Sequence, residues 1–98
     1  MQLLTKELRR KLPPLHSQEH EPDPMVIGKF FTPDAGWTWY AIEFDGEDLF
    51  FGYVVGIFPE LGYFQLSELK QVRGAFGLLV ERDRSFEPCR LSAITQRG

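Results

Sequence analysis

The sequence predicts an α+β fold, in which one antiparallel sheet of four or five strands is accompanied by short helices. Strand-like runs rich in aromatic and β-branched residues follow one another over residues 25–66, and only short turns separate them. Such short connections require antiparallel neighbours, because a parallel pair needs a long crossover. Helix-like segments lie on either side of this region, at 5–12 and 67–73. With 98 residues, the chain has room for a single domain spanning 1–98.

The N-terminal residues predict an amphipathic helix over 5–12. Leu4, Leu8 and Leu12 recur at intervals of four, which places them on one face of a helix. Thr5 is suited to the N-cap position, because its hydroxyl can accept a hydrogen bond from an amide of the first turn. Pro13 and the proline after it end the helix.

Residues 13–24, PPLHSQEHEPDP, predict a proline-rich loop. His16 and His20 are four residues apart, which is the helical spacing for two ligands of one metal ion. Prolines bracket the segment, however, and no cysteine lies near it, so two solvated histidines are the favoured interpretation. We therefore expect no metal site and no cofactor.

The sheet is expected to contain four consecutive strands. They are predicted at 25–31, 37–45, 48–58 and 63–66, with turns at TPDAG, DGED and PELG between them. The Asp-Gly pair of the second turn is a strong hairpin signal. A helix over 67–73 capped by Ser67, an edge strand over 78–86 and a helical turn over 91–95 are expected to follow.

The second predicted strand, WTWYAIEFD, carries two different faces. Strict alternation puts Trp37, Trp39 and Glu43 on one face, together with Ala41 and Asp45. The other face is apolar and is assigned to the core. The complete predicted core comprises Tyr40, Ile42, Phe44, Phe51, Tyr53, Val55, Phe64 and Leu66.

Two interpretations of the remaining face stay open. In the first, the N-terminal helix and the 13–24 loop cover the two tryptophans. In the second, the tryptophans stay partly exposed beside carboxylates and bind a protein partner, since tryptophan is a favoured interface anchor. The candidate binding residues are then Trp37, Trp39, Glu43, Asp45 and Asp48. A general acid/base pair of Glu43 and Glu60 has no support beyond the acidity of the two side chains.

Charge is distributed unevenly along the chain, although the net charge is only −3. Residues 13–66 carry nine carboxylates against Lys29 alone, whereas both ends of the chain are mildly basic. A general nucleic-acid-binding domain would show a strongly basic face, so this class is not favoured. The lone Cys89 excludes an internal disulfide and indicates a reducing, cytoplasmic location. No apolar run is long enough to span a membrane.

Several runs of the sequence resemble a family of small bacterial proteins that is known only as a domain of unknown function. The matching runs are WTWY, LFFGYV and ELGYF, with LLTKELRRKLPPLHSQE before them and ERDRSFEP after them. Members of that family are encoded on plasmids, integrative elements and phage-like islands. The resemblance therefore implies an accessory protein of a mobile genetic element, and it brings no activity, substrate or catalytic residue with it.

The expected function is that of a non-enzymatic module that binds a protein partner. The identity of the partner and the oligomeric state of the chain stay open. Three alternatives remain. The acidic middle of the chain could imitate DNA and inhibit a restriction or CRISPR component. The chain could be an enzyme, although it carries no nucleophile, metal or cofactor motif. It could also contact nucleic acid through basic residues near its ends. These residues are Arg9, Arg10, Lys11, Arg73, Arg82 and Arg84.

Overall fold

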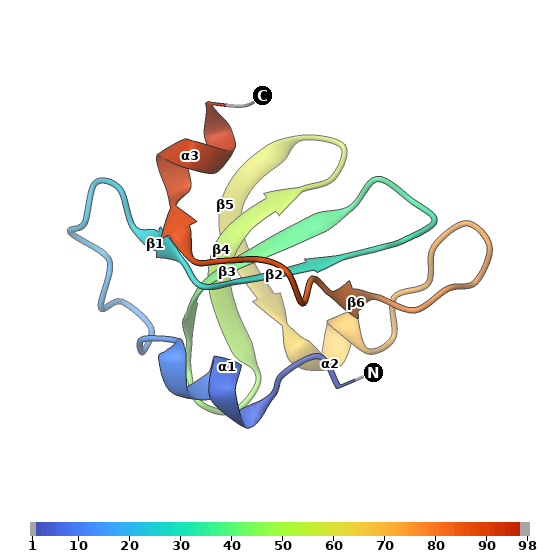
Figure 1. The fold of residues 1–98 in the computed structure, drawn as a ribbon, viewed down its shortest axis with the longest axis horizontal. Helices are drawn as coiled ribbons and strands as arrows, with labels where there is room; N and C mark the ends of the chain where they lie inside the picture. The colour runs from blue at the N-terminus through green and yellow to red at the C-terminus, as the bar shows by residue number, and fades with distance from the viewer. Residues whose placement is uncertain (1, 97–98) are drawn as a thin grey trace.

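The computed structural model describes residues 2–96 and is built around one five-stranded antiparallel sheet (Figure 1). Its strands are β2 (Gly28–Phe31), β3 (Thr38–Phe44), β4 (Leu49–Val55), β5 (Pro59–Gln65) and β6 (Glu81–Arg82). Their order across the sheet is β5-β4-β3-β2-β6. Strands β2 to β5 form a meander, and β6 returns to pair with the far side of β2. The predicted α+β fold with an antiparallel sheet is therefore confirmed.

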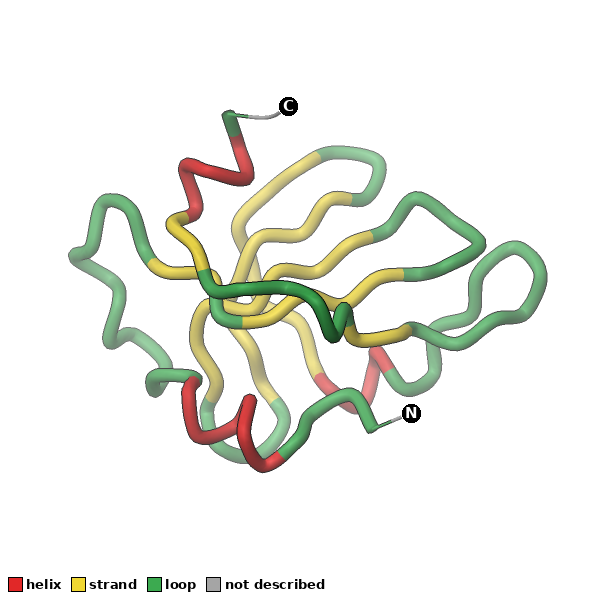
Figure 2. The backbone as a smooth tube through the Cα atoms, viewed as in Figure 1, coloured by secondary structure: helices red, strands yellow, loops and turns green. Residues whose placement is uncertain are grey.

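Short elements surround this sheet (Figure 2). The helices are α1 (Lys6–Lys11), α2 (Leu66–Leu69) and α3 (Leu91–Thr95). A second, two-stranded sheet joins β1 (Met25–Val26) to β7 (Cys89–Arg90). In α1, the Thr5 hydroxyl accepts a hydrogen bond of 3.1 Å from the amide of Leu8, as the sequence predicted. The pairing of β1 with β7 was not predicted.

Four predicted boundaries were wrong. The strand expected over 25–31 is divided into β1 and β2, which belong to different sheets. PELG is the start of β5 rather than a turn, and the β4–β5 hairpin turns at residues 56–58 instead. Pro59 is tolerated there because β5 is an edge strand. The helix expected over 67–73 is the shorter α2, whose N-cap is Gln65 rather than Ser67. The strand expected over 78–86 is reduced to the two residues of β6.

A β-bulge in β3 changes which side chains share a face of the sheet. Trp39 pairs with Val54 and Ala41 with Gly52, but the next pair along β3 is Glu43 with Phe51, so Ile42 is an additional residue. Alternation therefore shifts by one position after Ile42. We call the face that carries Trp39 and Ala41 the inner face and the opposite one the outer face. Phe44 returns to the inner face, whereas Tyr40 and Glu43 lie on the outer face.

The hydrophobic core lies on the inner face. Phe50 is at its centre, with the rings of Phe44 and Phe30 at centroid distances of 4.5 Å and 5.7 Å. The residues that cover this face come from the N-terminal segment and α1, from α2 and from the segment before β6. They are Leu3, Leu8, Leu12, Leu66, Leu69 and Val80.

The predicted core was correct for four residues and wrong for four. Ile42, Phe44, Phe64 and Leu66 are buried. The other four lie on the outer face and are only partly buried: the bulge separates Tyr40 from Phe44, and on β4, where both faces are apolar, the core is formed by the face of Phe50 rather than by that of Phe51. These four are Tyr40, Phe51, Tyr53 and Val55.

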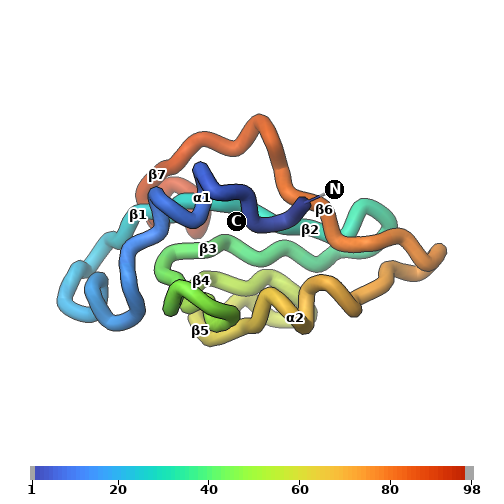
Figure 3. The backbone as a smooth tube through the Cα atoms, turned by 90° about the horizontal axis from the view of Figure 1, so that it is seen from below, coloured from blue at the N-terminus to red at the C-terminus, as the bar shows by residue number. Residues whose placement is uncertain are grey.

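The two margins of the sheet differ. Figure 3 shows β2 to β5 in succession, with the chain between β6 and β7 arching over the margin formed by β2. That margin is paired with β6. The opposite margin is β5, which pairs along seven residues with β4 on one side only. β5 is thus the long edge strand of the fold.

Candidate functional site

The two tryptophans do not form the exposed pair that one of the two interpretations required. Trp39 is a core residue with 7% of its surface exposed, whereas Trp37 is 41% exposed. Their rings stack at a centroid distance of 5.9 Å. The Trp37 ring also lies directly over Gly56, where an added Cβ would overlap it. Trp39 as an exposed contact residue is therefore a wrong prediction, because its face of β3 is the inner face.

Glu43 is an internal anchor. Its side chain is on the outer face and yet buried, and its carboxylate accepts hydrogen bonds from the backbone amides of His16 at 2.9 Å and Gln18 at 2.7 Å. Buried carboxylates require such partners, since an unpaired charge in the interior is costly. Glu43 therefore holds the 13–24 loop against the sheet, which its position in the sequence did not reveal.

Asp45 and Asp48 also form local structure. One carboxylate oxygen of Asp45 accepts the amides of Glu47, Asp48 and Leu49 at 2.8, 2.9 and 3.0 Å. The hydrogen bonds from the amides of Glu47, Leu49 and Asp48 lower the pKa of Asp45. Asp48 accepts the amide and the hydroxyl of Ser67 at 2.8 and 2.7 Å. The predicted aromatic and acidic face is therefore not assembled as one surface.

Exposed apolar side chains gather instead on the β4–β5 hairpin. Ile57 and Phe58 at its turn are 81% and 76% exposed, and Leu61 and Tyr63 on β5 are 53% and 55% exposed. We call these four residues the hairpin surface. Isolated exposed apolar residues are common, but four of the eight large apolar side chains that are exposed among the described residues lie on this one hairpin, a concentration that is typical of an interaction site. The run GIFPELGY contains all four residues, but the sequence alone does not indicate that their side chains are exposed.

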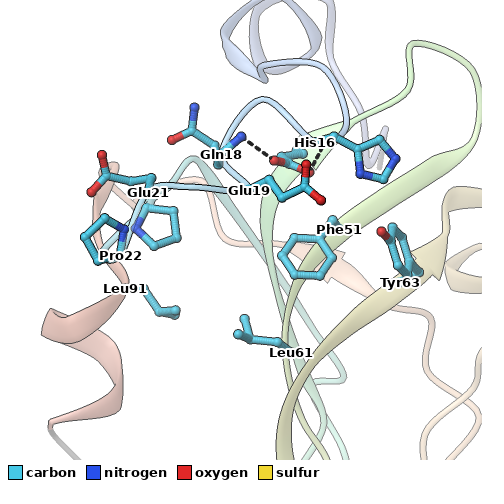
Figure 4. Close-up of a pocket in the computed structure, with 11 residues that line it drawn as sticks. His16, Gln18, Glu19, Glu21, Pro22, Phe51, Leu61, Tyr63 and Leu91 are labelled. Carbon is cyan, nitrogen blue, oxygen red and sulfur yellow. Dashed lines mark hydrogen bonds between the residues drawn. The ribbon is translucent and has the colours of Figure 1, made fainter.

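A cavity of about 330 Å³ adjoins the hairpin surface on the outer face (Figure 4). Leu61 and Tyr63 form one side of it, Phe51 of β4 forms its floor, and Leu91 of α3 closes one end. The 13–24 loop forms the opposite wall. Loop residues that line it are His16, Gln18, Glu19, Glu21, Pro22 and Pro24. The cavity is therefore apolar on the sheet side and polar on the loop side.

The charge of this cavity is negative. Glu19 and Glu21 are exposed on its loop wall, and Glu43, whose carboxylate accepts the two hydrogen bonds drawn in Figure 4, also lines the cavity. Among the residues that line the cavity there is no lysine or arginine. A ligand with an apolar body and a positive charge would complement both of its sides.

The wall of the cavity is fixed by a contact between the loop and α3. The carboxylate of Asp23 accepts the amide and the hydroxyl of Ser92 at 2.9 and 2.7 Å, and Arg90 donates to the Asp23 carbonyl at 3.1 Å. The hydrogen bonds from Ser92 lower the pKa of Asp23. The loop is thus tied to the sheet by Glu43 and to α3 by Asp23.

The basic residues expected to contact nucleic acid are only partly brought together. Lys11, Arg82 and Arg84 line a groove of about 340 Å³ that also holds Lys29. Its charge is partly compensated, because Lys11 pairs with Glu7 at 3.2 Å and Lys29 with Asp83 at 3.6 Å. Arg82 donates to the carbonyls of Gln2 and Leu3.

The other basic candidates lie outside this groove. Arg9 donates to the carbonyl of Gly46 at 2.7 Å, and its guanidinium lies over the Phe44 ring. Arg73 donates to the carbonyls of Lys70 and Val72, which follow α2. Arg10 is exposed on α1. A continuous basic stripe that follows a nucleic-acid backbone is not formed by these residues.

The described residues form neither a metal site nor the acid/base pair of Glu43 and Glu60. Within residues 2–96, no group of three or more His, Cys, Asp or Glu side chains is arranged to hold a metal ion. Glu43 and Glu60 cannot act as an acid/base pair, because Glu43 pairs with Phe51 on the outer face and Glu60 pairs with Val54 on the inner face. In the part of the chain that is described, no helix is long and apolar enough to cross a membrane.

Comparison with known proteins identifies a family for almost the whole chain. Residues 3–96 match a family described as "Protein of unknown function (DUF2958)". Neither the curated proteins nor the solved structures give a match. The match covers the hairpin surface, the cavity and every element of the sheet. The chain therefore belongs to the DUF2958 family of proteins of unknown function.

Proposed function

We propose that this protein is a small protein-interaction module that contacts its partner through the hairpin surface. The observation that carries the proposal is the exposure of Ile57, Phe58, Leu61 and Tyr63 on one hairpin. Burying such apolar side chains against a partner is favourable at about 25 cal/mol per Å², and aromatic residues are frequent anchors of interfaces. The adjacent acidic cavity supplies polar groups beside this patch, as the rim of an interface does.

This proposal keeps the type of function that the sequence predicted and changes the surface. Trp39 is no longer a proposed contact residue, because it is buried. Glu43, Asp45 and Asp48 are excluded as well, because their carboxylates bind backbone amides of the chain itself. An accessory role in a mobile genetic element and a cytoplasmic location stay predictions. The first rests on the family resemblance and the second on the lone Cys89. DNA mimicry, nucleic-acid binding and enzymatic activity are favoured by no specific contact.

Photo-cross-linking in the cells that express the protein tests the proposal. A benzoylphenylalanine at position 58 is expected to give discrete covalent adducts with one partner. The matched control is position 76, where Phe76 is equally apolar and 86% exposed but lies on the loop between α2 and β6. Phe58→Ser without a cross-linker should remove the partner from affinity purification. Equal adducts at both positions, or none at position 58, would refute the proposal.

A further inference from the structure

We propose that the hairpin surface binds an extended, basic peptide segment of a partner protein, which adds to the free edge of β5 as a further strand. The inference rests on the proposed function and specifies the chemistry of the partner. It depends on three features: unpaired backbone groups of β5, the position of the cavity beside them, and the negative charge of that cavity.

The backbone of β5 presents unpaired groups at its outer edge. The amide of Leu66 donates to the carbonyl of Asp48 at 2.8 Å, which continues the β4–β5 register by one pair. Hydrogen-bonded pairs alternate along an antiparallel ladder, so Phe64, Gly62 and Glu60 direct their backbone groups toward β4. Leu61 and Tyr63 consequently direct their N–H and C=O groups away from the sheet.

The free part of this edge is bounded at both ends. Pro59 has no N–H to offer. The amide of Gln65 is already bonded to the carboxylate of Glu68 at 3.0 Å. Leu61 and Tyr63 between them have no backbone partner on that side within residues 2–96. An extended peptide can therefore form hydrogen bonds with two successive outward-facing residues, which is the basis of β-strand addition.

An added strand would place alternate side chains beside the cavity. Leu61 and Tyr63 point to the outer face, where Figure 4 shows them along one side of the cavity. A neighbouring strand lies about 4.8 Å from β5. Only a long side chain from such a strand reaches past Leu61 and Tyr63 to the cavity. Lysine and arginine have that length, with an apolar stem for the aromatic side and a cationic end for the acidic wall.

Charge complementarity favours a basic peptide over a second copy of the chain as the occupant of the β5 edge. Residues 13–66, which include the cavity wall and β5, carry nine carboxylates against one lysine. Pairing of two β5 edges would bring two such acidic regions together, and like charges across an interface are unfavourable. A basic peptide experiences the opposite effect, so we assign the free edge of β5 to a basic partner rather than to self-association.

The test uses blocked synthetic peptides of seven residues, the length of β5, in which arginine alternates with valine or threonine. Binding to the full chain is followed through the amide NMR signals and amide hydrogen exchange of Leu61 and Tyr63. We expect protection of these two amides by the basic peptides. Peptides with glutamate in place of arginine should leave both amides unchanged.

N-methylation of the peptide distinguishes strand addition from simple charge attraction. Two versions of the basic peptide carry N-methyl groups at every second residue, in opposite phase. One phase blocks the edge that faces β5 and should bind about tenfold more weakly, while the other should keep its affinity. Equal affinities for the two phases would overturn strand addition, because charge attraction alone does not depend on phase.

Matched variants of the protein test the role of the cavity. The double substitution Glu19→Gln and Glu21→Gln is expected to weaken binding of the basic peptide about two- to tenfold. The double substitution Glu7→Gln and Glu47→Gln removes two exposed carboxylates outside the cavity and should have no effect. Equal losses in both variants would show that only net charge matters and would contradict the inference.

Three further outcomes distinguish the two proposals. Protection of Leu61 and Tyr63 that rises with protein concentration and needs no peptide would identify a second copy as the occupant and refute the inference. Adducts at position 58 in cells without any binding of basic peptides would leave the interaction module standing and refute the extended basic partner. Failure of both experiments would refute both proposals.

Discussion

The carboxylate of Glu43 and the backbone amide of Gln18 form a hydrogen bond of 2.7 Å between residues 25 positions apart in the chain. The second oxygen of the same carboxylate accepts the amide of His16. A loop without regular secondary structure is thereby held to the sheet by a buried side chain, in addition to the hydrogen bond of 2.9 Å from the Phe44 amide to the Pro13 carbonyl. The same contact builds part of the wall of the cavity, so Glu43 contributes both to stability and to the shape of the candidate site.

Glu43→Ala should therefore destabilise the fold and release the loop. We expect a loss of about 2–4 kcal/mol in the free energy of unfolding, because two hydrogen bonds to a charged acceptor are removed. Urea denaturation measures the loss, and amide hydrogen exchange of His16 and Gln18 should become faster. Glu47→Ala is the control, since Glu47 is exposed in the β3–β4 turn. Equal stabilities of the two variants would show that Glu43 is not an anchor.

Gly56→Ala should displace Trp37 with little loss of stability. The new Cβ overlaps the ring of Trp37, which is partly exposed and can rotate outward. We expect a shift of the tryptophan emission to longer wavelength and a loss of about 1 kcal/mol. Gly62→Ala is the matched control, because nothing lies within 4 Å of the new Cβ on β5. Unchanged emission in Gly56→Ala would contradict the stacking of Trp37 over this glycine.

Gly74→Ala should release the loop between α2 and β6. The carboxylate of Asp34 occupies the space of the new Cβ, and it accepts the amides of Phe76 at 2.6 Å and Leu78 at 3.3 Å. Displacing the carboxylate removes these bonds, at about 1 kcal/mol or more each. Faster amide exchange at Phe76 and Leu78 is the expected readout. Gly36→Ala should have no such effect, because its new Cβ has open space around it.

The free energy of unfolding should decrease in acid, because the carboxylates of Asp45 and Asp23 become protonated. Hydrogen bonds to each carboxylate lower its folded pKa below the ordinary value of 3.8. The two charged carboxylates contribute to the free energy of unfolding above pH 3.8, and this contribution is lost as the pH falls through the lowered folded pKa. Asp45→Asn cannot titrate, so its stability deficit relative to the natural chain should shrink below pH 3.8. A deficit that stays constant from pH 6 to pH 2 would show that Asp45 contributes nothing through its charge. Glu47→Gln serves as the control.

The order of the elements was predictable because it depends on local signals. The aromatic and β-branched runs identified the strands, and the Asp-Gly pair identified the β3–β4 turn, where Gly46 has a φ of +90°. Thr5 identified the start of α1, because an N-cap residue is also a local signal. The short pairing of β1 with β7 was not predictable, since two-residue strands carry no periodicity of their own.

The faces of β3 were mispredicted because alternation assumes a regular strand. Nothing in the run Ala41, Ile42, Glu43 marks the position of the additional residue, so strict alternation grouped Tyr40 with Phe44 although the bulge places them on opposite faces. Alternation could not identify the core face of β4 either, because both of its faces are apolar. The roles of the carboxylates were hidden for a different reason. Their partners are backbone amides, some of them far away in the chain, and side-chain identity gives no information about such partners.

The additional residue in β3 can be lost without changing the faces of its neighbours. A deletion of Ile42 would restore regular alternation, with Glu43 still opposite Phe51 on the outer face and Phe44 still opposite Phe50 on the inner face. The 13–24 loop would keep its acceptor, whereas the chain would lose a fully buried side chain. Homologous chains with one residue fewer at this point should therefore still carry a carboxylate at the position of Glu43.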